Sequence, residues 1–179
     1  MLVGLKTPRS AASVSALLLE CHERIRKFIG LACRLGGASD LPAEHVAEAA
    51  RDVRRYFEEA LPLHAQDEEQ SILPRLKGRN EALDRWLEAM TAEHRTHAPL
   101  IEALCATCGV LQAAPETLED NRDKLVATST ALQHEFAVHL QQEEEYIIPA
   151  IDRWISAQAQ AEVLDEIRAR RAGAPRGIP

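Results

Sequence analysis

The sequence predicts an all-α fold, namely an antiparallel up-down-up-down four-helix bundle with an additional C-terminal helix. Apolar residues recur at the three-and-four spacing of amphipathic helices, and no segment shows the alternation of a strand. Aromatic residues make up only 4% of the 179 residues, while Ala, Leu and Glu dominate. The segment His64–Pro74 returns as His139–Pro149, so the chain consists of two similar halves.

The first half contains two predicted helices. One runs from about Ser10 to Leu35, and the pair Gly36-Gly37 is expected to end it, because glycine adopts the left-handed cap conformation cheaply. The other runs from about Pro42 to Leu73. We expect Pro62 to kink it and Pro74 to end it, because proline cannot continue the hydrogen-bond ladder of a helix.

The second half repeats this arrangement. A third helix is predicted from about Glu81 to Cys108, with a bend or local distortion at Pro99. After a loop over 109–117, a fourth helix runs from about Leu118 to Ile147, and Pro149 ends it. Four helices in two hairpins pack most simply as an up-down-up-down bundle.

A fifth, shorter helix is predicted from about Asp152 to Arg171, where it caps or flanks the bundle. Residues 10–171 are therefore expected to form one helical bundle domain. Residues 1–9 are expected to be a flexible arm, and the Gly/Pro-rich residues 172–179 a disordered tail.

The amino-acid composition limits the classes of partner that this protein is expected to bind. The net charge of −7 argues against a nucleic-acid surface. No run approaches the ~20 apolar residues of a membrane span, and the N-terminus lacks the pattern of a secretory signal. Four irregularly spaced cysteines do not form a disulfide framework. These features predict a cytoplasmic monomer or homodimer without a nucleic-acid or membrane partner.

Each copy of the repeat places a histidine and a glutamate four residues apart, which puts both side chains on one face of a helix. The preceding helix of each half carries one matched histidine, at nearly the same offset. If the two halves face each other in a bundle, six side chains meet in its core. These candidate metal ligands are His22, His64, Glu68, His94, His139 and Glu143.

Imidazole nitrogens and carboxylate oxygens without a thiolate suit iron, manganese or zinc. Two carboxylates in the middle of the set could bridge two metal ions. Each ion would then have about two histidines and shared oxygens, which leaves positions open for dioxygen, peroxide or nitric oxide. The same arrangement could store the metal itself.

The motif order resembles that of the hemerythrin-like HHE cation-binding domain. A lone His precedes His-x3-Glu in each half, each motif continues to Ile-Leu-Pro or Ile-Ile-Pro, and Glu93-His94-Arg95 is similar to the third-helix signature of that family. The resemblance covers about Ser13 to Ile151. It implies a four-helix bundle that holds two non-haem iron ions with carboxylate bridges. Members act in oxygen binding, in iron or redox sensing, and in nitric oxide or iron–sulfur repair responses.

The chain departs from the oxygen-carrying members of the family at one position. Those proteins have a further histidine four residues after the third-helix histidine, where this chain has Ala98. His97 lies three residues after His94 and is a candidate for an additional ligand. The second motif also keeps Glu143, which makes pure oxygen carriage less favoured.

The sequence thus predicts a metal-binding protein with a non-haem diiron centre that binds O2, NO or peroxide for sensing, storage or stress response. One alternative is a diiron enzyme, such as an oxidase, a peroxidase or an NO reductase. Another is a structural or interaction module in which the metal only staples the bundle.

Neighbouring carboxylates are weaker candidates. Asp67 is disfavoured as a ligand because the matching residue of the second copy is Gln142. Glu69 and Glu144 lie about 140° around the helix from the repeat histidines, so a solvated face is expected for them.

The remaining histidines and the cysteines are expected outside the site. His45 and His134 are predicted at the surface. The lone Cys105-x2-Cys108 pair lacks the second pair of a zinc site, so small buried apolar roles are expected. A redox pair between Cys33 and Cys105 is a further hypothesis.

Overall fold

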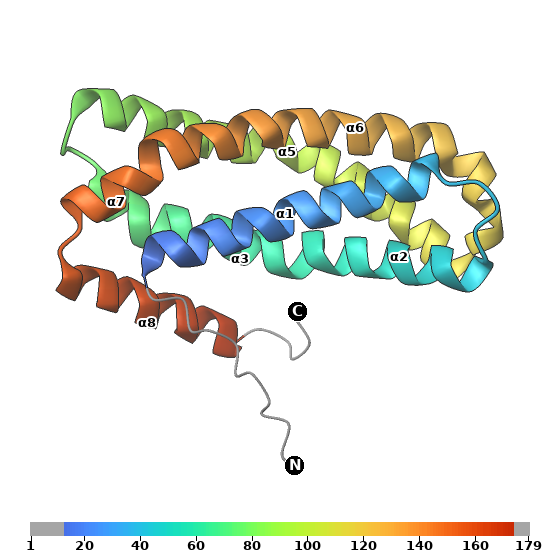
Figure 1. Ribbon diagram of the computed structural model, residues 1–179, viewed down its shortest axis with the longest axis horizontal. Helices are drawn as coiled ribbons and strands as arrows, with labels where there is room; N and C mark the ends of the chain where they lie inside the picture. The colour runs from blue at the N-terminus through green and yellow to red at the C-terminus, as the bar shows by residue number, and fades with distance from the viewer. Residues whose placement is uncertain (1–12, 174–179) are drawn as a thin grey trace, which may run out of the picture.

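The computed structural model describes residues 13–173, and every regular element in that range is helical (Figure 1). Four helices form the bundle: α1 (Val14–Gly37), α2 (Ala43–Arg55), α5 (Glu81–Ala113) and α6 (Leu118–Gln142). They pack in a closed ring, in which α1 contacts α2 and α6, and α5 contacts the same two helices. The predicted all-α four-helix bundle with an additional C-terminal helix is confirmed.

Two bundle helices continue beyond their first segment through π-helical turns. After α2 come η1 (Tyr56–Ala60), α3 (Leu61–Gln66), η2 (Asp67–Ile72) and α4 (Leu73–Leu76). After α6 come η4 (Glu143–Ile147) and α7 (Ile148–Trp154), and the C-terminal helix α8 (Ala157–Gly173) follows a short break. The predicted helix ends at Pro74 and Pro149 are therefore wrong, because the chain stays helical past both.

The π turns explain how these prolines fit inside a helix. Pro62, Pro74 and Pro149 each lie at the second residue of the α segment that follows a π turn. A proline has no N–H, and its ring clashes with the carbonyl four residues earlier in a regular helix. The wider turn removes this conflict, since the residue before each proline donates its N–H to the carbonyl five residues earlier.

The end of α1 also differs from the prediction. Both Gly36 and Gly37 are helical without a positive φ, and Ala38 ends the helix in an extended conformation. The Arg122 guanidinium of α6 caps this end by donating to the carbonyls of Gly36 and Ala38. A Cβ at Gly36 would lie 2.9 Å from Val126 Cγ2, whereas one at Gly37 would meet nothing within 4 Å. Gly36 is thus required for close packing of α1 on α6.

Helix α5 runs further than predicted, to Ala113, and is α-helical on both sides of Pro99. The expected loop over 109–117 is reduced to a short connection that includes the 3-10 turn Pro115–Thr117. The C-terminal helix starts at Ala157 rather than near Asp152, which belongs to α7.

Helix α8 lies against one end of the bundle, beside α1 and η2 (Figure 1). Val163 and Ile167 are its buried residues. At its end, Arg170 and Arg171 donate to the carboxylate of Asp67, which is fully buried in η2. This contact fixes α8 to the turn that follows the first repeat histidine. The helix also includes residues 172 and 173, which were assigned to the tail above.

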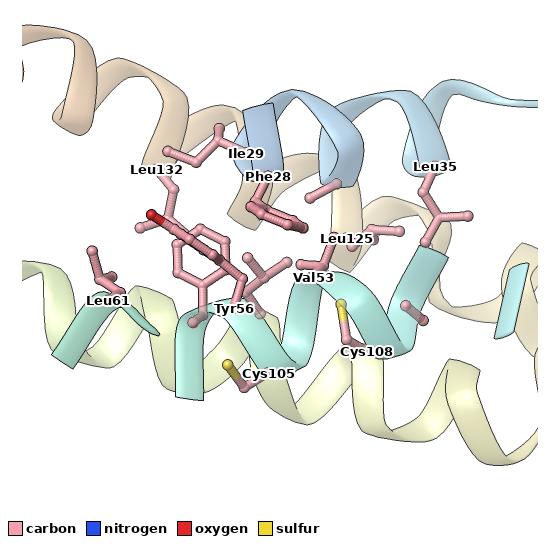
Figure 2. Close-up of a cluster of buried hydrophobic side chains, with 14 of the residues drawn as sticks. Phe28, Ile29, Leu35, Val53, Tyr56, Leu61, Cys105, Cys108, Leu125 and Leu132 are labelled. Carbon is pink, nitrogen blue, oxygen red and sulfur yellow. The ribbon is translucent and has the colours of Figure 1, made fainter. Parts of the chain in front are cut away.

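A buried polar layer divides the apolar core into two clusters. One cluster, between the polar layer and the α1–α2 connection, contains Phe28 and Tyr56, whose rings stack at 4.3 Å (Figure 2). The other lies at the opposite end, with α7 and α8. Cys105 and Cys108 belong to the first cluster, as expected for small apolar residues (Figure 2). Burial raises the pKa of the Cys105 thiol to about 11 and that of Cys108 to about 12.

The predicted arm over 1–9, the first residues of the predicted first helix and the tail over 174–179 lie outside the described residues. Within residues 13–173, none of the helices combines the length and the apolar character that a membrane crossing requires.

The two glycines at the end of α1 provide a matched test of this packing. We expect Gly36→Ala to lower stability by about 1–2 kcal/mol, because the added methyl group overpacks the contact with α6. Gly37→Ala should be neutral or stabilise by up to about 0.5 kcal/mol, since alanine costs less backbone entropy in a helix. Thermal and urea unfolding measure both variants, and equal effects would contradict the assigned role of Gly36.

Candidate metal centre

The bundle brings all six predicted ligand residues into its polar layer. All but His94 are buried, and His94 is only slightly exposed. The six come from every helix of the bundle: His22 on α1, His64 on α3, Glu68 on η2, His94 on α5, His139 on α6 and Glu143 on η4. Side chains far apart in the sequence thus meet in one place, as the repeat predicted.

Their potential ligand atoms form two groups, each gathered within 4.8 Å. The first group consists of His22, His64, Glu68 and Glu143, all buried. The second consists of His94, His139 and Glu143, so the two groups share one glutamate. This donor set fits metal ions that prefer imidazole and carboxylate.

The Glu143 carboxylate lies between one histidine of each group. Its Oε2 atom is 3.2 Å from His22 Nε2, and its Oε1 atom is 3.1 Å from His139 Nε2. Each oxygen of Glu143 therefore faces a different group.

Glu68 has the equivalent position in the first repeat. Its Oε1 atom is 3.4 Å from His64 Nε2, and its Oε2 atom is 3.4 Å from His94 Nε2. The second histidine group thus also faces an oxygen of Glu68. Each pair of histidines therefore faces one oxygen of each carboxylate, although only the first group gathers both glutamates within 4.8 Å.

Three of the four histidines are oriented by a further carboxylate at Nδ1. An ionised carboxylate only accepts hydrogen bonds, so Nδ1 is the donor and Nε2 remains for a metal. The contacts are His22–Glu144 at 2.9 Å, His94–Glu69 at 2.8 Å and His139–Glu93 at 2.7 Å. The Nδ1 atom of His64 is buried without a partner among the described residues.

These orienting contacts correct one expectation. Glu69 and Glu144 do not simply face solvent, because each contacts a histidine of a neighbouring helix. The angular positions of these two glutamates around their own helices could not show a contact with a neighbouring helix. Their recurrence at the same place in both repeats is the signal that could have found them. Glu93 had a weaker signal, its position next to His94.

The other weak candidates lie where expected. Asp67 is paired with the two arginines of α8 rather than with the histidines. His45 and His134 are exposed. All four cysteines are free, which leaves the hypothesis of a Cys33–Cys105 redox pair untested.

The polar atoms at the centre of the site are arranged better for binding a metal ion than for hydrogen-bonding to one another. Buried atoms without a hydrogen-bond partner among the described residues include Nε2 of His22 and His64, Oε2 of Glu68 and both oxygens of Glu143. Buried polar atoms are normally paired, and leaving one unpaired costs about 1–3 kcal/mol. These unpaired atoms point to one another, so shared cations would satisfy them together.

Protons are the alternative to metal ions at this site. Burial by itself lowers the pKa of a histidine, but the Glu143 carboxylate outweighs it and raises the pKa of His139 to about 9. Glu143 likewise raises the pKa of His22, and Glu68 raises that of His94. At His64, burial prevails and lowers the pKa. In the metal-free protein His139 therefore holds a proton at neutral pH.

A cavity of about 270 Å³ adjoins the second group. It lies between α3 and α5 and is named here the α3–α5 cavity. Three ligand histidines line it together with His97, which is 2% exposed. His97 does not belong to either group of clustered ligand atoms. Its ring lies against Phe136 and His139, with centroids 4.6 and 5.1 Å apart, and burial lowers its pKa to about 4.

Together, the fold and the site define a helical bundle with a buried histidine–carboxylate centre. Residues 13–108 match the model of the hemerythrin HHE cation-binding domain. Since this match spans more than half of the 179 residues, the chain belongs to that family. The match contains four of the six predicted ligands and ends before His139 and Glu143. A search of curated proteins finds no match.

The orienting glutamates can be tested with adjacent residues of η4. We expect Glu144→Gln to weaken metal binding by about 10- to 100-fold, because the amide orients His22 less strongly than the carboxylate does. Glu145→Gln, a change at an exposed neighbouring residue, should leave affinity unchanged. Competition with a chromophoric chelator measures both. Equal affinities in the two variants would show that Glu144 does not contribute to metal binding.

The shifted pKa values predict how metal binding depends on pH. The folded pKa of His139, about 9, lies above the ordinary value of 6.5, so the proton that it holds stabilises the metal-free fold below pH 6.5 and is lost as pH rises through 9. A metal must displace this proton. Apparent affinity should therefore rise between pH 6.5 and 9, with proton uptake by the buffer in calorimetry. Constant affinity across this range would contradict the prediction.

Proposed function

We propose that this protein holds two iron ions in a non-haem, carboxylate-bridged centre and binds dioxygen, nitric oxide or peroxide there. The observation that carries the proposal is the position of Glu68 and Glu143, each with one oxygen toward each histidine group. Two separate ions sharing two carboxylates account for all six side chains at once. Sensing, storage or stress response is the role that we propose for such a centre.

The ligand set supports iron with positions left open. Four imidazoles and two shared carboxylates give each ion about four ligands, whereas six-coordinate sites are common for iron, so an external ligand has room to bind. When bound, iron supplies these positions and an electron that a small oxidant can accept. The chain supplies the rest: glutamates orient the imidazoles, and apolar residues of the α3–α5 cavity line the approach to one side of the centre.

Peripheral features support a small-molecule partner. The net charge of −7 disfavours nucleic acid, and the proposed partner is a diatomic molecule or peroxide that enters through the cavity. We place the protein in the cytoplasm as a monomer or a homodimer.

Metal content tests the proposal. After anaerobic ferrous loading, the protein should contain two irons per chain, and nitric oxide titration should give a saturable change in visible absorption. His139→Ala should lose at least one iron, because it removes a ligand of the second group. His134→Ala, on the same helix but exposed, should retain both irons.

Other results would contradict the proposal or favour one of its alternatives. One zinc per chain, or equal iron in the two histidine variants, would contradict a two-iron centre. Repeated turnover of peroxide or nitric oxide would favour the enzyme alternative over binding. Two irons without any change on addition of ligand would favour a metal that only staples the bundle.

A further inference from the structure

The α3–α5 cavity is larger than a diatomic molecule or peroxide needs. Its volume is about 270 Å³. A water molecule occupies about 30 Å³ in the liquid, and a cavity of about 150 Å³ is enough to bind benzene. The cavity therefore has room for a small organic molecule of one ring with substituents.

The walls of the cavity indicate an uncharged occupant. Apolar side chains from three helices line most of it, among them Phe57, Leu61, Ile101 and Phe136. Among the described residues that line it there is no lysine or arginine, and the exposed Glu102 is the only carboxylate. An apolar ring would exchange water for hydrocarbon contact over most of this wall, and positive charge is confined to the side that the histidines of the metal centre form.

His97 offers the cavity a polar group that the metal groups do not use. The residue is 2% exposed, and its Nδ1 atom is buried without a hydrogen-bond partner among the described residues. Its ring is fixed by packing against Phe136. Since Nδ1 is buried away from water, the other ring nitrogen, Nε2, is the atom available to an occupant of the cavity, and a neutral imidazole can donate or accept a hydrogen bond there.

We propose that the α3–α5 cavity binds an uncharged, mainly apolar organic molecule that carries one hydrogen-bonding group, such as a phenol, and that His97 bonds this group. The occupant lies beside His94 and His139, so the metal centre and the organic ligand share a wall. This site goes beyond the binding of a diatomic molecule or peroxide.

Calorimetry with three matched probes tests the proposal on purified protein of measured metal content. The probes are 4-methylphenol, toluene, which lacks the hydroxyl group, and 4-methylbenzoate, which adds a negative charge. We expect 4-methylphenol to bind about five- to tenfold more tightly than toluene, the worth of one hydrogen bond. The benzoate should bind most weakly.

Variants locate the bound probe. His97→Phe should remove the preference for 4-methylphenol over toluene while retaining the packing of an aromatic ring. Ile101→Trp places a larger side chain in the cavity from a half-buried position and should reduce binding of both probes at least tenfold. Ala92→Phe is the control, since Ala92 is exposed on the same helix away from the cavity. Ile101→Phe is a second filling variant if the first does not fold.

Two results would overturn the proposal: no binding of 4-methylphenol at millimolar concentration, or equal binding by the Ile101→Trp and Ala92→Phe variants. Metal analysis of the same samples separates this inference from the proposed function. Probe binding to protein without iron would support the cavity site alone, and two irons without probe binding would overturn the cavity site alone.

Discussion

Two buried carboxylates, Glu68 and Glu143, impose the constraint that the rest of the bundle satisfies. Removing an unpaired carboxylate from water costs several kcal/mol, so each needs positive charge or strong hydrogen-bond donors nearby. Four histidines from four helices supply this environment, and three of them are held by a further glutamate. The apolar core is divided in two by this layer, one cluster on each side. Metal ions or protons must therefore fill a site that hydrophobic packing alone could not stabilise.

The backbone around the buried glutamate has the same form in both repeats. Each copy combines a histidine on an α-helical segment, a glutamate in a π turn and a proline after that turn. The Glu68 and Glu143 carbonyls accept the wider hydrogen bonds that accommodate Pro74 and Pro149. Widened turns of this kind are common at functional sites, since they shift a side chain without ending the helix. Only the first copy is also clamped by α8, through Asp67.

The sequence predicted the bundle and the six side chains that meet in it because a duplicated spacing of four residues constrains both helix face and partner. It could not predict contacts that cross between helices. Glu69 and Glu144 were placed on a solvated face from the angle on their own helix, yet both reach histidines of a neighbour. Pro74 and Pro149 were expected to end helices, because proline chemistry excludes a regular turn but not a π turn. Gly36 was taken for a cap, although its missing side chain serves the approach of α6.

The distance between the two proposed iron ions tests the central claim most directly. Ions bridged by shared carboxylates lie about 3.5–4 Å apart, and X-ray absorption detects a metal neighbour at that range. The account predicts iron–iron scattering at this distance in the ferrous-loaded protein, and its loss when Glu68 and Glu143 are both changed to alanine. A bound iron in the unaltered protein that has only nitrogen and oxygen neighbours would contradict it.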